Sequence, residues 1–485
     1  MRKRLVAYPA AVEPGTGWER LPMTFHRMPS TRVLVCNSAG EHLLLSREEF
    51  DQLALGQISD PDLLRRLRSR HLVRDPDDSL PIDLLAMKER TRYSRLSALT
   101  QLHIFVVTLR CEHSCHYCQV SRRTADRAGF DMTVETAEAA LAVAFCTPSR
   151  SLKIEFQGGE PLLNFGTIKW TVLRAKEIAV EYEKEVSFVI TTNLALLDDD
   201  VISFCRDEEI FISTSLDGPE SLHNRNRPRP GHDSWARTIS GIRRIQAEIG
   251  PHAISALMTT TETSLTQPTE IIDTYIGLDL LDIFLRPISP YGLAVRSHSH
   301  DRYGTNQWLA FWRAGLDYIL ELNRNGVPAI ERYSAIVLSK MLSGVEPGYV
   351  DLRSPAGIGI GALLYNYDGD VYASDEGRML AEMSDHTFRL GNLETDGWDD
   401  LLLSEQLLDP LDQSLAQSAP MCSDCAFERF CGADPVYHHA TSGDFLGRKP
   451  TSGFCNRNMG VFETLIERYH DDPHARGVFQ TWAAT

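Results

Sequence analysis

The sequence predicts an α/β protein in three parts, with a parallel β-sheet in the central part. Between about residues 100 and 330, six short apolar segments alternate with amphipathic helical segments, a rhythm typical of parallel strands joined by right-handed crossovers. The sheet is either open and doubly wound or a partial barrel. We expect a small α+β module over residues 1–95, the α/β core over 96–330, and an irregular, metal-held domain over 331–485, where the alternation is lost and cysteines gather.

Length and composition limit the class of protein. The 485 residues are enough for about three domains of ~150 residues. A formal net charge of −17 argues against nucleic-acid binding, which usually relies on a basic face. No apolar run approaches the ~18 residues of a membrane span. Met1-Arg-Lys-Arg resembles the start of a signal peptide, but Pro9 and Glu13 interrupt the apolar stretch, so we expect a cytoplasmic protein.

The first 95 residues predict a hairpin followed by small helices. The apolar segments 32–36 and 41–45 flank the turn sequence Asn37-Ser-Ala-Gly40. Ser46 and Glu49 have capping-box spacing, so a helix is expected to begin there and to stop near Gly56. Asp60 before Pro61 predicts a second helix, over residues 62–72.

The central part supplies the strands and helices of the predicted core. The expected strands are Leu102–Thr108, Leu152–Phe156, Val186–Thr191, Ile210–Ser215, Ala253–Thr259 and Asp282–Arg286. The clearest helical segments between them are Val134–Phe145, Thr167–Tyr182 and Trp308–Asn323.

The strongest chemical signal is a group of three cysteines, Cys111, Cys115 and Cys118, directly after the first strand. Three thiolates on one loop suit iron–sulfur chemistry or zinc. In a [4Fe–4S] cube they would leave one iron without a protein ligand, which is the open position that an enzyme needs. The alternative is a zinc site completed by His113 or His116.

Polar or glycine-containing segments follow the next three strands, namely Gln157-Gly158-Gly159-Glu160-Pro161, Thr191-Thr192-Asn193 and Ser215-Leu216-Asp217-Gly218. Ligands bind at the carboxyl ends of parallel strands, so we expect these segments to converge on one site together with the cysteine loop.

Each residue type in these segments has a chemical task. Gly158 and Gly159 allow close approach of the backbone to a ligand, and Glu160 could hold an ammonium group. Hydrogen bonds to hydroxyls or a carboxylate are expected from Thr191, Asn193 and Ser215. Asp217 either does the same or caps a turn. Arg227 offers a fork for a carboxylate, its alternative being a solvated surface charge.

Here the chain resembles the radical S-adenosylmethionine (SAM) superfamily. The resemblance rests on Cys-x3-Cys-x2-Cys after the first strand, an aromatic residue before the third cysteine, and the Gly-Gly-Glu-Pro segment. It implies a partial (β/α)6 barrel whose open iron is chelated by the amino and carboxylate groups of SAM. Reductive cleavage then yields a 5′-deoxyadenosyl radical that abstracts hydrogen from the substrate. The SAM contacts implied are Tyr117, Gln157, Gly158, Gly159, Glu160, Thr191, Asn193, Ser215, Asp217 and Arg227.

A second cysteine group, Cys422, Cys425, Cys431 and Cys455, resembles the SPASM extension of peptide-modifying radical SAM enzymes. A complete SPASM domain binds two auxiliary clusters. Here Ser374 and Pro435 stand where two of its cysteines are expected. The resemblance therefore implies one auxiliary [4Fe–4S] cluster on the four cysteines, the alternative being a four-cysteine zinc site.

Other residues in the sequence have both a functional and a structural interpretation. In sulfatase-maturing relatives an aspartate at the position of Asp375 is a proton-accepting candidate, whereas a surface turn aspartate is the plain interpretation here. The pair His438-His439 is predicted to be structural or exposed. The remaining cysteines lie in apolar stretches and are predicted to be buried; they are Cys36, Cys146 and Cys205.

Within the superfamily, the chain resembles the B-type radical SAM maturase of His-Xaa-Ser systems. The resemblance rests on four segments: 109–122, 222–228, 366–378 and 431–438. It implies a ribosomally made precursor peptide as substrate and a second, paired radical SAM protein. A low-potential electron donor is also required. The N-terminal module looks like a winged-helix, PqqD-type element that binds a leader peptide at a sheet edge, or else it is a structural extension.

Three alternatives to a peptide maturase stay open at this stage. One is a sulfatase-type maturase acting on a protein, which usually carries two auxiliary clusters. Another is a non-catalytic iron–sulfur electron carrier or scaffold for a partner enzyme. The third is a zinc-stabilised binding protein.

Overall fold

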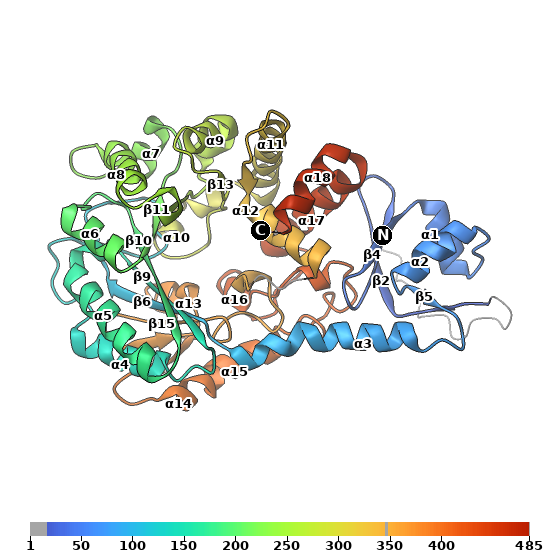
Figure 1. The fold of residues 1–485 in the computed structure, drawn as a ribbon, viewed down its shortest axis with the longest axis horizontal. Helices are drawn as coiled ribbons and strands as arrows, with labels where there is room; N and C mark the ends of the chain where they lie inside the picture. Colours follow the sequence, from blue (N-terminus) through green and yellow to red (C-terminus); the bar gives the residue numbers. More distant parts are fainter. Residues whose placement is uncertain (1–16, 345–347, 485) are drawn as a thin grey trace.

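We analysed a computed structural model that describes residues 17–344 and 348–484 (Figure 1). The basic N-terminal stretch lies outside the described residues. Within them, no helix is both long enough and apolar enough to span a bilayer.

The N-terminal module forms as the local signals predict. Strands β3 (Val33–Asn37) and β4 (His42–Leu45) make the expected hairpin, and β2 (Met23–Arg27) adds a third antiparallel strand on the other side of β3. Helix α1 (Arg47–Leu55) begins at a complete capping box and ends at Gly56, whose φ of 72° is left-handed. Helix α2 (Pro61–Ser69) begins at Asp60, which accepts a hydrogen bond from the Asp62 N–H. Short strands β1 (Glu19–Arg20) and β5 (Val73–Arg74) pair beside it.

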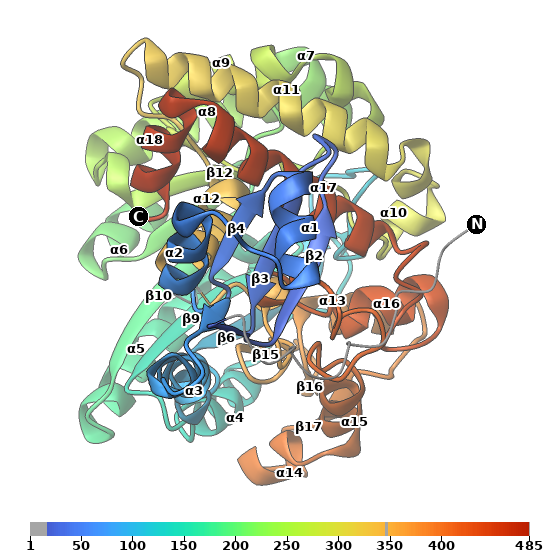
Figure 2. The ribbon, with the colours of Figure 1, turned by 90° about the vertical axis from the view of Figure 1, so that its right-hand side faces the viewer.

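Alternation along β3 and β4 divides this sheet into two apolar faces. Val33, Val35 and Leu45 pack with α1 and α2 in a core of their own. Leu34 and Leu44 belong instead to the large core of the molecule. The module is therefore docked on the rest of the chain (Figure 2), and helix α3 (Leu80–Tyr93) leads from it to the central part.

The central sheet has the order β12-β11-β10-β9-β6-β15-β16-β17. Five of the predicted strands are here, as β6 (Leu102–Thr108), β9 (Ser151–Gly158), β10 (Glu185–Thr192), β11 (Phe211–Ser215) and β12 (Ile254–Leu257), and neighbours among them are parallel. The sixth differs: β13 covers only Asp282–Ile283 and pairs with β14 (Ile330–Glu331) in a separate ribbon. Pro287 and Pro290, which cannot donate to a ladder, follow it.

The helices follow the outer side of this sheet, which curves as part of a barrel (Figure 1). The three predicted helices are α4 (Val134–Ala144), α5 (Phe165–Glu181) and α11 (Thr305–Arg324). The others of the central part are α6 (Asp199–Asp207), α7 (Glu220–Asn226), α8 (Ser234–Glu248), α9 (Pro268–Ile276), α10 (Leu293–Arg296) and α12 (Arg332–Leu338).

The C-terminal part continues the same sheet. Strand β15 (Ala362–Tyr365) is parallel to β6, and β16 (Asp370–Tyr372) and β17 (Arg389–Asn392) follow antiparallel. Its helices are α13 (Asp375–Ala381), α14 (Trp398–Leu402), α15 (Glu405–Gln413), α16 (Pro435–Ser442), α17 (Gly453–Asp471) and α18 (Pro473–Trp482). The mouth of the barrel is thereby flanked by C-terminal elements.

The three isolated cysteines divide into two buried and one exposed. Cys36 and Cys205 are buried, as predicted. The prediction for Cys146 is wrong, since this residue is exposed. It lies two residues beyond the end of α4, where the apolar face of the helix has already turned away.

Candidate functional site

The first cysteine group lies on a closed loop at the carboxyl end of β6. Cys111 ends β7 (Arg110–Cys111), which pairs with β8 (Arg123–Thr124) and so joins the two ends of the loop. Inside the loop, the Cys118 N–H donates to the Cys115 carbonyl at 3.2 Å. Backbone bonds from outside hold it on two sides, from the Ser114 N–H to the Pro228 carbonyl at 2.8 Å and from the Leu293 N–H to the Cys118 carbonyl at 2.9 Å.

A chain of buried hydrogen bonds runs from this loop to α7 and α8. His223 Nδ1 accepts from the Asp217 N–H at 3.3 Å, so the ring is neutral and its Nε2–H donates to Ser234 Oγ at 2.9 Å. The Ser234 hydroxyl then donates to His113 Nε2 at 2.8 Å, and the His113 Nδ1–H donates to Glu112 at 2.7 Å. Burial lowers the pKa of His223 to about 3, which agrees with a neutral ring.

These hydrogen bonds argue against a zinc site that is completed by His113. Both nitrogens of His113 are engaged by Glu112 and Ser234, so neither is free for a metal. Cys111, Glu112 and His113 come within 4.8 Å of one another, and their proximity is explained by these hydrogen bonds. His116 is exposed on the loop.

The glycines after β9 are required by a neighbouring strand. A Cβ on Gly158, where φ is 140°, would lie 2.0 Å from the Thr108 carbonyl oxygen, and one on Gly159 would lie 2.2 Å from that of Arg110. Sequence reasoning attributed these glycines to a ligand. The structure adds that the β6–β7 backbone already occupies the space that a side chain would need.

Glu160 is fully buried and joins the ends of β9 and β10. Its carboxylate accepts hydrogen bonds from Thr192 Oγ1 at 2.6 Å, the Asn193 N–H at 2.8 Å and the Leu162 N–H at 3.1 Å. Burial and then the charge of Glu112 raise the pKa of Glu160 to about 8. Asn193 Nδ2 in turn donates to Glu112 at 2.9 Å and lies 4.0 Å from Cys111 Sγ.

Asp217 is the centre of a second buried group. It accepts from the Tyr117 hydroxyl at 2.6 Å, from Arg227 Nε and Nη2 at 3.1 and 3.2 Å, and from the Thr259 N–H at 3.2 Å. Burial alone would raise the pKa of Asp217, but the Arg227 guanidinium more than offsets it and the pKa is lowered. Arg227 also stacks on Tyr117, 5.3 Å from the ring centroid. Arg227 is thus a buried ion-pair partner beside the cysteine loop and no surface charge.

The other predicted contacts line the same end of the sheet. Thr191, at the end of β10, donates to Glu155 at 2.8 Å. Ser215 ends β11, and Gln157 pairs with Val106 near the end of β9.

The chemistry of the first loop fits an iron–sulfur cluster. Burial raises the pKa values of Cys111 and Cys115, so metal binding must displace protons there. Arg378 is 2% exposed, and its charge acts on the Cys118 thiol. Arg378 Nη2 donates to the Val120 carbonyl at 2.9 Å and Nη1 forms a long ion pair with Glu382 at 3.8 Å, whereas Nε and Nη1 make no hydrogen bond. The Arg378 guanidinium thus keeps two N–H groups without a hydrogen bond beside the cysteine loop, and its charge is suited to an anionic, thiolate-bound cluster.

The second group places four thiols around one centre. Cys422, Cys425, Cys431 and Cys455 are close enough for their charges to act on one another's pKa values. Among the described residues, no three of them come within 4.8 Å of one another. A single zinc ion with Zn–S bonds of ~2.3 Å would need tighter spacing. The wider arrangement suits a four-iron cube.

Asp375 and the histidine pair are placed by the C-terminal helices. Ser374 Oγ accepts from the Gly377 N–H and caps α13, so Asp375 is the first helical residue and is partly buried. His438 bonds the Asp434 carbonyl and Ser452, and His439 bonds Asp385 at 2.7 Å. Both histidines therefore have structural partners.

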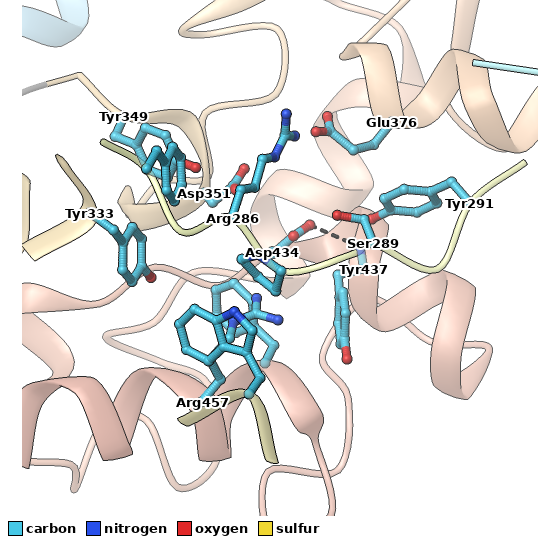
Figure 3. A pocket seen from close by; sticks show the side chains of 14 residues that line it. Arg286, Ser289, Tyr291, Tyr333, Tyr349, Asp351, Glu376, Asp434, Tyr437 and Arg457 are labelled. Atoms are coloured by element: carbon cyan, nitrogen blue, oxygen red, sulfur yellow. Dashed lines mark hydrogen bonds between the residues drawn. The ribbon is translucent and has the colours of Figure 1, made fainter. Parts of the chain in front are cut away.

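A cavity beside the cysteine loop was missed by sequence reasoning. Its charged lining residues are Arg286, Asp351, Glu376, Asp434 and Arg457 (Figure 3). They come from five separate segments of the chain, so no local sequence pattern predicts that they share a cavity. Arg286 ends a predicted strand, and Glu376 follows Asp375, but nothing in the sequence links the two.

Comparisons with known proteins agree with this geometry. Residues 105–264 match the family model of the radical SAM superfamily. An uncharacterised protein of Methanocaldococcus jannaschii is 28% identical over 158 residues, which is 32% of this chain and 52% of that protein. The chain thus spans no more than about half the length of the curated relatives it matches.

Two solved structures share the fold. One is anSMEcpe with bound SAM, with a TM-score of 0.63, 16% identity, and coverage of 78% of this chain and 99% of that one. The other is Streptococcus suis SuiB bound to its precursor peptide SuiA, with a TM-score of 0.53, 15% identity, and coverage of 89% and 98%.

The cysteine loop, its position at the carboxyl ends of the parallel strands and the family match all concern the same stretch of chain. Enzymes of this superfamily hold a [4Fe–4S] cluster and SAM there. Residues 105–264 therefore form a radical SAM domain.

Proposed function

We propose that this protein is a radical SAM maturase that modifies a ribosomally made peptide. Cys111, Cys115 and Cys118 hold the reactive cluster, and one auxiliary cluster is bound by Cys422, Cys425, Cys431 and Cys455. When bound, the first cluster and SAM supply the radical that removes a hydrogen atom from the substrate.

The observation that carries the proposal is the position of the cavity between the two cysteine groups. On one side, Ile288 packs on Tyr117, and Ser289 accepts a 3.5 Å hydrogen bond from Gln119, next to Cys118. On the other side, the cavity is lined by Asp434 and Arg457, which lie three and two residues beyond Cys431 and Cys455. A substrate residue held here would lie between the radical source and the auxiliary cluster.

The chain's own residues have distinct tasks in this proposal. Ten side chains or backbone groups at the barrel mouth are proposed to orient SAM: Tyr117, Gln157, Gly158, Gly159, Glu160, Thr191, Asn193, Ser215, Asp217 and Arg227. Asp375 borders the cavity, since its charge acts on Arg286 and Glu376. We propose that its carboxylate takes up a proton from the substrate.

The N-terminal module is proposed to bind the leader of the peptide. In the described part of the chain, β2 and β4 each pair on one side only, so two sheet edges are open to an added strand. The module also contacts the second cysteine group, because the His26 and His42 rings pack on Phe427 and Phe430 with centroids 4.7 and 5.5 Å apart. A leader bound there would lie next to the domain that receives the rest of the peptide.

Two solved neighbours give independent support, since SuiB was crystallised with its precursor peptide and anSMEcpe with a short peptide. We further propose a low-potential electron donor, a paired radical SAM protein and a cytoplasmic location. A sulfatase-type maturase is less favoured, because Ser374 stands in place of a cluster cysteine and caps a helix.

The test is anaerobic reconstitution of the wild type and of the C111A/C115A/C118A variant. We expect about eight irons in the wild type, about four in the variant, and SAM cleavage in the wild type alone. Co-expression with each small open reading frame beside the gene, followed by mass spectrometry, tests the peptide. Zinc in place of iron, or SAM cleavage by the triple variant, would contradict the radical SAM assignment of the site.

A mass change that requires the three cysteines supports the maturase. The D375N variant should retain SAM cleavage and lose the mass change. Retention of the full mass change would show that Asp375 is not the proton acceptor.

A further inference from the structure

The cavity between the two cysteine groups has a lining that selects for charge. The cavity has a volume of about 40 Å³, which is room for about three water molecules or for the charged end of one amino-acid side chain. Its walls come from residues 284–291, from α11 and α12, from residues 349–351, and from α13, α16 and α17. In Figure 3 the labelled side chains are directed into one space from these separate elements.

The charges of the lining do not balance. Two guanidinium groups, of Arg286 and Arg457, share the cavity with three carboxyl groups, of Asp351, Glu376 and Asp434. If every group is ionised, two positive charges meet three negative ones, and the lining carries a net charge of −1. Burial raises the pKa of all three carboxyl groups, so a further cation is needed to keep all three ionised together.

Two further carboxyl groups lie close behind this wall. The charge of Asp375 acts on Glu376, Asp351 and Arg286, and Glu155 is acted on by both Asp375 and Arg286. Two cations accompany them, since Lys153 acts on Glu155 and Arg378 acts on Asp375. This second layer therefore adds no net charge, and the excess of one carboxyl group belongs to the lining itself.

The arginines act on the carboxyl groups only at longer range. Among the described residues, neither Arg286 nor Arg457 forms an ion pair, although Figure 3 shows Arg286 and Glu376 turned toward one another. Arg457 instead lies over Phe454 and Tyr437, at 5.6 and 5.9 Å from the ring centroids. Burial and then the charge of Asp351 raise the pKa of Asp434 to about 7, and the charge of Arg457 offsets only part of this rise.

Aromatic rings form much of the rest of the wall. The seven aromatic lining residues are Phe284, Tyr291, Trp308, Tyr333, Tyr349, Tyr437 and Phe454. Phe284 stacks on Tyr333 at 5.8 Å, and Tyr349 meets both rings edge-on at 6.5 and 6.1 Å. Aromatic faces together with carboxylates are the surroundings in which proteins bind organic cations.

An inorganic cation fits the arrangement less well. A bound Mg²⁺ or Ca²⁺ needs several oxygen ligands within about 2.0–2.6 Å, so the ligands must converge. Among the described residues, no three of these carboxyl groups come within 4.8 Å of one another. The carboxylate oxygens surround the cavity but do not converge on one position where they could coordinate a metal ion.

The cavity is reached through an outer vestibule. Four residues line both spaces: Pro287, Trp308, Tyr437 and Arg457. The outer space adds about 510 Å³ and is lined by residues of α10, α11, α13 and α16. A peptide backbone could lie in the vestibule while one side chain reaches inward.

We propose that this cavity binds the cationic side chain of a peptide residue, that is, an ammonium, guanidinium or imidazolium group held between Asp351, Glu376 and Asp434 against the aromatic wall. The inference rests on the proposed function and names its substrate class: the segment presented to the radical centre carries lysine, arginine or protonated histidine.

The test measures binding without turnover. Anaerobically reconstituted protein, saturated with SAM, is titrated with three blocked amino acids: Nα-acetyl-lysine N-methylamide, the norleucine analogue, which lacks the charge, and the glutamate analogue. Ligand-observed NMR gives each dissociation constant. We expect the lysine probe to bind at least tenfold more tightly than the other two.

Two variants change the charge of the cavity lining in opposite directions and should therefore change lysine-probe binding in opposite directions. D434N removes one negative charge but preserves the cap of α16, where Asp434 accepts from the Tyr437 N–H at 2.9 Å, because asparagine caps a helix equally well. It should weaken lysine-probe binding about tenfold and leave norleucine-probe binding unchanged. R457M removes a positive charge and should strengthen lysine-probe binding. E376Q repeats the first test on another helix, in case D434N does not fold.

The outcomes separate this inference from the proposed function. Equal affinity for the lysine and norleucine probes, with iron content and SAM cleavage intact, would overturn the cation-binding site. The proposed maturase function would not be affected by that result. Displacement of the lysine probe by Mg²⁺ alone would assign the negative charge to a metal ion and also overturn the cation-binding site. Preference for the lysine probe that D434N abolishes and R457M enhances supports it.

Discussion

Replacing Asp217 by asparagine tests whether the buried ion pair beside the cysteine loop stabilises the radical SAM domain. Asp217 is fully buried and Arg227 is 12% exposed. Water therefore solvates the guanidinium poorly once a neutral amide replaces the carboxylate. The amide is the same size as the carboxyl, so packing is preserved. It can no longer serve as an anionic acceptor for both Arg227 and Tyr117.

The magnitude follows from the burial of the pair. Removing one partner of a buried ion pair costs about 3–5 kcal/mol, since the other charge is left uncompensated. For a domain of this size each 1 kcal/mol lowers Tm by roughly 2–4 °C. We therefore expect the D217N variant to melt about 6–20 °C below the wild type.

The assay is differential scanning calorimetry of the reconstituted protein, with two comparisons. In E138Q, which breaks the exposed Glu138–Arg174 pair, Tm should be unchanged, because exposed ion pairs contribute little. In D217N/R227M the loss should be smaller than in D217N, because no unpaired charge stays behind. A D217N Tm within 2 °C of the wild type, or a double variant less stable than D217N, would refute the reasoning.

Three further predictions concern the site and its supports. In G159A the new Cβ meets the Arg110 and Leu109 carbonyl oxygens at 2.2 and 2.6 Å; iron bound per chain should fall, whereas G166A, with open space around the Cβ, should retain it. S234A leaves two buried histidine nitrogens without their partner, so it should cost about 1–3 kcal/mol in thermal unfolding, and S240A on the exposed side of the same helix should cost nothing measurable. His103 has its pKa lowered from an ordinary 6.5 to about 3 by burial. Its neutral form is thus favoured by the fold, and the resulting stability is complete above pH 6.5 and declines as the pH falls toward 3. Between pH 7 and 5, Tm should fall more steeply in the wild type than in H103Q; parallel curves would contradict this assignment.

The local elements follow directly from the sequence. The capping box at Ser46, the stop at Gly56 and the cap at Asp60 act within a few residues of chain, so their signals are complete in the sequence. The five main strands are likewise marked by short apolar runs bounded by turns. The spacing of Cys111, Cys115 and Cys118 restricts the chemistry to soft metals before any fold is known.

The roles of the residues at the strand ends depend on contacts with residues that are distant in the sequence. The sequence marks Gly158 and Gly159 as special, but only the packing of β6 against β9 shows that neighbouring carbonyls exclude a side chain there. Asp217 and Arg227 are ten residues apart, and burial decides that they pair with each other and with Tyr117.

The cavity is decided by tertiary structure alone. Its charged residues are spread from Arg286 to Arg457, on elements that meet only because β15 joins β6 and so brings the C-terminal helices to the barrel mouth. A sequence records local spacing, and it identified the cysteine loop for that reason. The imbalance of charge between Asp351, Glu376 and Asp434 arises from side chains more than 20 residues apart, whose mutual distances are set by packing and not by the chain between them.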